Sequence, residues 1–112
     1  MIYANPGSAG AKVAYKPRYD NFIGGKFVAP VKGGYFDVIT PITGKPYTQA
    51  ARSTAEDIEL VLDAAHAAAD KWGKTPAAER ANVLLRIADR IESNLELLAY
   101  AETVDNGKAI RE

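Results

Sequence analysis

A change of apolar periodicity near Ser53 constrains the fold of this 112-residue chain more than any other feature. After Ser53, apolar residues recur at the three- and four-residue spacing of amphipathic helices. Before it, short β-prone runs alternate with glycine pairs and prolines, a pattern typical of hairpins. We therefore predict two β-hairpins followed by helices, which is an α/β arrangement.

Glycines mark the predicted turns of the first half. Gly24-Gly25 separates two short apolar runs and predicts a two-residue turn, because glycine adopts positive φ without steric cost. A second hairpin is predicted from Tyr35 to Ser53, with its turn at Thr40-Pro41-Ile42-Thr43-Gly44 and Gly44 left-handed. Residues 1–19 are expected to be an arm lying on something else, or else a loose terminus.

Capping signals bound the predicted helices. Ser53 and Glu56 fit a capping box, Gly73 fits a helix end, and Thr75-Pro76 fits the start of a second helix. Because the link between the helices is short, we expect them to pack antiparallel. The two apolar stripes are Ile58, Val61, Leu62, Ala65, Ala69 and Trp72, then Leu84, Ile87, Ala88, Ile91, Leu95 and Leu98.

Several apolar residues do not fit this pairing. Val83, Leu85 and Leu97 lie away from the second stripe, so this helix is expected to have more than one packing partner. Residues 109–112 carry no capping or helix-breaking residue, so the chain is expected to stop inside an element. Both features predict that this is a piece of a longer protein.

Composition favours an ordinary globular protein, with 47% apolar and 25% charged residues. No apolar run reaches the roughly 18–20 residues that span a bilayer. The N-terminus lacks the basic and apolar regions of a secretory signal, so a cytoplasmic location is expected. The sequence contains no cysteine, which excludes a disulfide, a thiolate metal site and a cysteine nucleophile within it.

Charge is divided between the halves. Residues 1–53 contain seven Lys/Arg and two Asp/Glu residues. Residues 54–112 contain seven Lys/Arg and twelve Asp/Glu residues. The basic residues are spread out rather than clustered with aromatic neighbours, which argues against nucleic-acid binding. The opposite charges indicate instead that the halves face each other or other protein.

Few side chains are candidates for chemistry. His66 is the only histidine and has no partner ligands at metal-binding spacing, so we interpret it as a surface or boundary residue. The glycine pairs match no phosphate-binding loop. Asp105-Asn106-Gly107-Lys108 is the most distinctive tetrapeptide, and its residues predict a helix end.

Four segments follow one another in a characteristic order: residues 21–28, residues 36–44, the paired helices with residues 86–92, and residues 102–108. Together, from about Tyr19 to Glu112, they resemble the N-terminal part of NAD(P)-dependent aldehyde dehydrogenases. Finer features, such as residues 19–25 and 62–66, are similar to bacterial enzymes acting on acetaldehyde and other aliphatic aldehydes.

This resemblance implies an oxidoreductase that converts an aldehyde to a carboxylic acid. A cysteine thiolate attacks the aldehyde, NAD or NADP accepts the hydride, and a glutamate activates water. These residues are expected beyond Glu112, so the resemblance implies that this segment holds no catalytic or cofactor-binding residue. Residues 1–19 then form an N-terminal arm, and residues 20–112 the first part of the cofactor-binding domain.

The expected partners are the remainder of the parent chain, a small aldehyde and further copies in a homo-oligomer. The alternative is a freestanding fragment that acts as an interaction or self-association module through its apolar helix faces.

The resemblance also implies a structural K⁺ or Na⁺ ion. Its ligands in this segment would be the backbone carbonyls of Val38 and Ile39 and the carboxylate of Asp105. Oxygen donors of this kind suit a hard cation. The alternative is that Asp105 only hydrogen-bonds a nearby backbone group.

Overall fold

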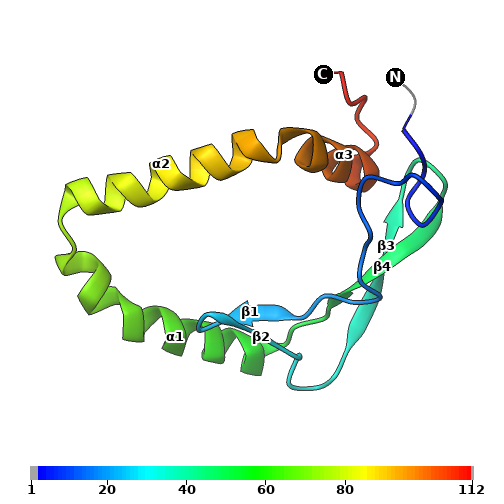
Figure 1. Cartoon of the computed structure of the whole chain (residues 1–112). Helices are drawn as coiled ribbons and strands as arrows, with labels where there is room; N and C mark the ends of the chain where they lie inside the picture. The colour runs from blue at the N-terminus through cyan, green and yellow to red at the C-terminus, as the bar shows by residue number, and fades with distance from the viewer. Residues whose placement is uncertain (1–2, 112) are drawn as a thin grey trace.

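The computed structural model describes residues 3–111, which form two antiparallel strand pairs followed by three helices (Figure 1). The predicted α/β arrangement of two hairpins and helices is confirmed. The elements are β1 (Asn21–Ile23), β2 (Lys26–Val28), β3 (Tyr35–Thr40), β4 (Lys45–Ala51), α1 (Ala55–Lys74), α2 (Ala77–Ser93) and α3 (Leu95–Asn106).

The glycine turns are as predicted. Gly24 and Gly25 join β1 to β2 with φ angles of 59° and 83°, so both occupy the region that glycine enters without strain. Gly44 closes the β3–β4 turn at φ 68°, and its amide donates to the Thr40 carbonyl at 2.9 Å. Local turn chemistry therefore determines both hairpins.

A β-bulge interrupts the second hairpin. Val38 pairs with Thr48, but Ile39 pairs with Pro46, so Tyr47 is an extra residue on β4. Proline has no amide hydrogen and cannot complete the ladder, which explains the position of the bulge.

Residues of the proposed N-terminal arm form hydrogen bonds with β4 and α3. Tyr19 forms a parallel bridge with Ala50, and its amide donates to the Gln49 carbonyl at 2.8 Å. Farther along, the Tyr100 hydroxyl of α3 donates to the Ala4 carbonyl at 2.7 Å. The first two residues of the predicted arm lie outside the described residues, as does Glu112.

The start of α1 differs from the prediction by one residue. The cap is Thr54 with Asp57, not Ser53 with Glu56: the Asp57 carboxylate accepts the Thr54 amide at 2.8 Å. Its second oxygen accepts the Val31 amide at 2.9 Å, so Asp57 also ties the loop after β2 to the helix. Ser53 instead donates to the Asn21 side chain at 2.9 Å.

The predicted boundary between the first two helices is also shifted. Gly73 is helical rather than left-handed, and α1 continues to Lys74. Thr75 is extended, because the residue before a proline avoids the helical region, and its hydroxyl donates to the Lys71 carbonyl. Pro76 therefore occupies the cap position that was predicted for Thr75.

The second predicted stripe is divided between two helices. Asn94 leaves helical geometry at φ −123° and ψ 22°, which separates α2 from α3. The Ser93 and Asn94 side chains donate to the carbonyls of Asp89 and Arg90, and such bonds compete with the helical ladder. Leu95 and Leu98 consequently belong to α3.

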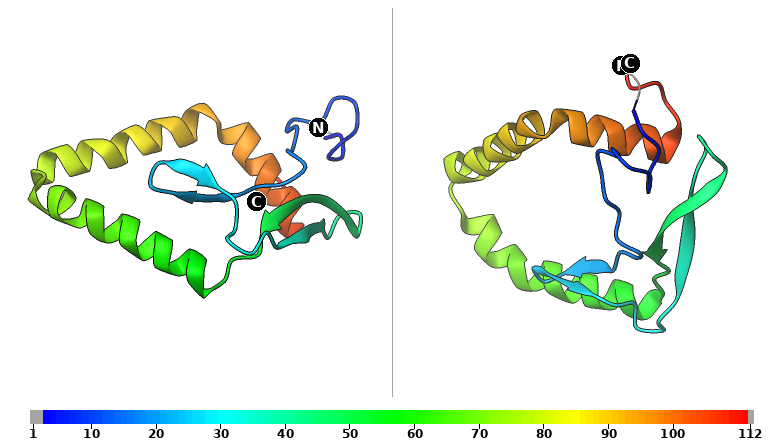
Figure 2. Two further views of the ribbon diagram at one scale, coloured as in Figure 1. Left: turned by 90° about the horizontal axis from the view of Figure 1, so that it is seen from below. Right: turned by 45° about the vertical axis from the view of Figure 1, so that its right-hand side comes forward.

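The prediction that the first two helices pack antiparallel is wrong. Figures 1 and 2 show α1 and α2 meeting at one corner and then diverging, so their facing stripes do not touch along their length. Short links bring helix ends together, but only apolar contact brings the axes together. Leu84 and Leu85 remain 67% and 62% exposed, so both sides of α2 lack a partner.

The end of the chain also differs from the prediction. Residues 107–111 form neither helix nor strand, because Gly107 ends α3 in the left-handed conformation. No helix within residues 3–111 has the length and apolar character needed to cross a bilayer.

The buried core lies where α3 packs on β3. Tyr100 and Val104 of α3 are almost completely buried, as is Thr40 at the end of β3. The chain is flat, with extents of 48 × 38 × 20 Å. Its elements are arranged around an open middle, and the contact between α3 and β3 joins the two ends of this arrangement (Figure 1). A core of this size leaves most apolar side chains exposed.

The small core makes a prediction for the 112-residue chain alone. It should unfold over a broad temperature range and bind a hydrophobic dye, because the apolar faces of α1 and α2 are uncovered. Calorimetry and dye fluorescence measure this. A monomer with a sharp cooperative transition and no dye binding would contradict it.

The Asp57 cap should make the stability of the intact protein depend on pH. Hydrogen bonds from Thr54 and Val31 hold the pKa of Asp57 below its ordinary value of 3.8. Because the folded pKa is the lower one, this stabilisation is complete well above 3.8 and is lost as pH falls through the folded pKa.

We therefore expect Asp57→Asn to lower the melting temperature by several degrees at neutral pH, with the difference from wild type narrowing below about pH 4. Thermal melts across pH measure this, with exposed Asp63→Asn on α1 as the control. A difference that stays constant into acid would be evidence against the cap.

Candidate cation site

The predicted cation ligands lie where α3 meets the second hairpin. Val38 and Ile39 are neighbours on β3, and Asp105 occupies the last turn of α3, which packs on that strand. The structure thus brings two segments that are distant in sequence into one region. It does so through the same contact that forms the buried core.

A bulge disrupts the hydrogen-bond ladder beside the two proposed carbonyl ligands. Its register shift falls between Val38 and Ile39, opposite Tyr47, which is the residue left without a strand partner. The backbone carbonyls of Val38 and Ile39 are oxygen donors of the type that suits a hard cation.

The Asp105 carboxylate accepts a hydrogen bond from a side chain. The alternative prediction was a hydrogen bond to a nearby backbone group. The Tyr47 hydroxyl donates to its Oδ1 atom at 2.8 Å. Sequence reasoning missed Tyr47, although Pro46 inside a strand run is a signal for a bulge at this position.

Gly107 allows the end of α3 to approach the turn after β3. Its φ is 77°, and a Cβ atom built there would lie 2.9 Å from the Pro41 side chain. The Asn106 side chain accepts the Lys108 amide at 2.8 Å, which completes the helix end predicted from residues 105–108. The motif therefore fixes the backbone that carries Asp105.

Electrostatics make this region attractive to a cation. Unpaired carbonyls give the C-terminal end of a helix partial negative charge, and Asp105 adds a carboxylate there. Burial and then the hydrogen bond to Asp105 raise the pKa of Tyr47, so its phenol remains a donor. Burial also raises the pKa of neighbouring Tyr15.

The residues present fit a monovalent cation better than a transition metal. Within residues 3–111, no three His, Cys, Asp or Glu side chains gather as a metal site. Carbonyl oxygens with a single carboxylate suit a hard cation of low charge. His66 is exposed on α1, away from this region.

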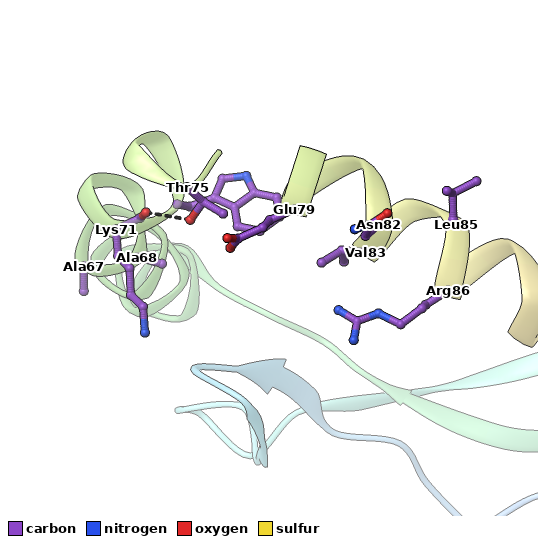
Figure 3. Close-up of a pocket in the computed structure, with 10 residues that line it drawn as sticks. Ala67, Ala68, Lys71, Thr75, Glu79, Asn82, Val83, Leu85 and Arg86 are labelled. Carbon is purple, nitrogen blue, oxygen red and sulfur yellow. Dashed lines mark hydrogen bonds between the residues drawn. The ribbon is translucent and has the colours of Figure 1, made fainter. Parts of the chain in front are cut away.

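A larger pocket lies at the corner of α1 and α2 but offers no catalytic arrangement (Figure 3). It has a volume of about 810 Å³ and is mainly apolar. Lys71, Glu79 and Arg86 are its charged residues, and no cysteine is present to act as a nucleophile. Its mainly apolar lining suits contact with another apolar surface.

Comparison with known proteins identifies the family. The profile described as "Aldehyde dehydrogenase family" matches residues 27–112. An aldehyde dehydrogenase of Rhodospirillum rubrum is 67% identical over all 112 residues, and an acetaldehyde dehydrogenase of Pseudomonas aeruginosa is 65% identical over the same length. The chain spans 22% of the length of each of these curated relatives.

Solved structures agree. PnpE in complex with nicotinamide adenine dinucleotide matches with a TM-score of 0.81 and 41% identity, over 83% of this chain and 19% of that one. The motifs, the folded arrangement and the sequence relatives point to one family, which confirms the resemblance found in the sequence. The chain belongs to the aldehyde dehydrogenase family.

Proposed function

We propose that this chain is the N-terminal scaffold segment of an enzyme that oxidises an aldehyde to a carboxylic acid with NAD or NADP. The observation that carries the proposal is the match of the whole chain, at 65–67% identity, to aldehyde dehydrogenases of which it spans 22% of the length. The catalytic cysteine, the glutamate and the nucleotide-contacting residues then lie in the remaining sequence.

Within that enzyme, residues 1–19 act as the arm and residues 20–112 as the first part of the cofactor-binding domain. When bound, the cofactor supplies the hydride acceptor for the aldehyde. This segment contributes no group to the chemistry, since it has no cysteine and no nucleotide-binding motif. Its role is to position β3, β4 and α3.

The exposed apolar faces are assigned to packing against the remainder of the chain rather than to an independent interaction module. Half-exposed Ile58, Trp72 and Ile87 would otherwise face water along most of α1 and α2. A homo-oligomer, a small aldehyde substrate and a cytoplasmic location, where NAD(P) is supplied, complete the proposal.

An activity assay tests the proposal. The full-length protein should reduce NAD or NADP with a short aliphatic aldehyde such as acetaldehyde, and the 112-residue chain should not. Absorbance of the reduced nicotinamide measures both. A folded full-length protein that oxidises no aldehyde in a panel of short and long chains, with either cofactor, would contradict the proposed activity.

The proposed cation site predicts a specific salt effect. K⁺ or Na⁺ should stabilise the full-length protein relative to choline at equal ionic strength, by about 1.4 kcal/mol at roughly ten times Kd. Asp105→Ala should abolish this difference.

Thermal melts in the three chlorides measure the cation effect. Asp63→Ala on the exposed surface of α1 removes the same charge elsewhere and should keep the effect. If wild type and Asp105→Ala respond identically, Asp105 is not a cation ligand.

A further inference from the structure

We propose that Tyr47 is the positioning residue that orients Asp105 toward the cation, a role that rests on the cation site proposed above. The Tyr47 hydroxyl donates a hydrogen bond to the Asp105 carboxylate. The Tyr47 backbone lies at the bulge, opposite Val38 and Ile39, whose carbonyls are the proposed ligands. One residue thus links the strand half of the site to the helix half.

The bulge determines where Tyr47 points. In a regular ladder, adjacent residues such as Val38 and Ile39 have adjacent partners. Here their partners are Thr48 and Pro46, so Tyr47 lies between them without a strand partner. An extra residue of this kind re-aims its side chain, and the phenol reaches an acceptor 58 residues away on α3.

A phenol is a suitable partner for a carboxylate that must bind a cation. The Tyr47 hydroxyl occupies Oδ1 as a neutral donor, which leaves Oδ2 and the full negative charge of Asp105 available. A lysine or arginine partner would neutralise that charge and compete with the ion. No ion pair of Asp105 occurs among the described residues.

The arm holds Tyr47 in place. The Tyr15 ring packs edge-on against it, with centroids 4.7 Å apart and planes at 68°. The neighbouring Thr48 hydroxyl donates to the Lys16 carbonyl at 2.7 Å, which ties β4 to the same part of the arm. The Tyr15 hydroxyl is buried without a hydrogen-bond partner among residues 3–111, so its ring serves packing here.

Tyr47→Phe tests the proposal in the full-length protein, because it removes the hydroxyl and keeps the ring. Titration with K⁺ and with Na⁺ against choline, followed by thermal melts, gives the midpoint of cation stabilisation. We expect that midpoint to rise roughly tenfold, since outer partners of metal ligands typically have effects of this size. The midpoint is independent of any change in the melting temperature measured in choline.

Tyr35→Phe is the matched control. It removes another phenol-to-carboxylate bond of the same hairpin, from Tyr35 to Asp20 at 2.6 Å, at the opposite end of β3. Its cation midpoint should equal that of wild type. A rise of the same size in both variants would overturn the proposal, because it would reflect general loosening of the hairpin.

The remaining outcomes separate the two proposals. A Tyr47→Phe midpoint equal to wild type, with Asp105→Ala insensitive to cations, overturns the role of Tyr47 and leaves the site. A wild-type protein insensitive to K⁺ and Na⁺ overturns the site and the role of Tyr47 together.

Discussion

The contact between α3 and β3 is the interaction on which the rest of this structure depends. It buries Tyr100 and Val104 against the strand end at Thr40, and it joins the helical half of the chain to the hairpin half. Gly107 makes the contact possible, because a side chain at that position would collide with Pro41. The same contact sets Asp105 beside Tyr47, so the core and the candidate site have one cause.

Outside this contact, the apolar faces of α1 and α2 have few packing partners among the described residues. Burial of apolar surface is the main force in folding, and α1 and α2 leave most of theirs in water. The chain spans 22% of the length of a matching relative, and we propose that additional sequence of that kind covers these faces. In the proposed enzyme, the segment positions elements for chemistry carried elsewhere.

Local features could be predicted from the sequence, whereas distant partners could not. The turns at Gly24-Gly25, Gly44 and Gly107 follow from backbone sterics within a few residues. Periodicity identified the apolar faces of the helices but not what covers them, so the antiparallel packing was wrong. The bond from Tyr47 to Asp105 joins residues 58 apart and needs the bulge and the α3 contact together. Pro46 indicated the bulge, but nothing in the sequence indicated the contact with α3.

Hydrogen exchange offers the most direct test of this account as a scaffold covered by the rest of the protein. Amides of α1 and α2 should exchange slowly in the full-length enzyme, and at least about a hundredfold faster in the 112-residue chain. Equal protection of both helices in the two proteins would contradict the account, because the segment would then be stable without the surfaces proposed to cover it.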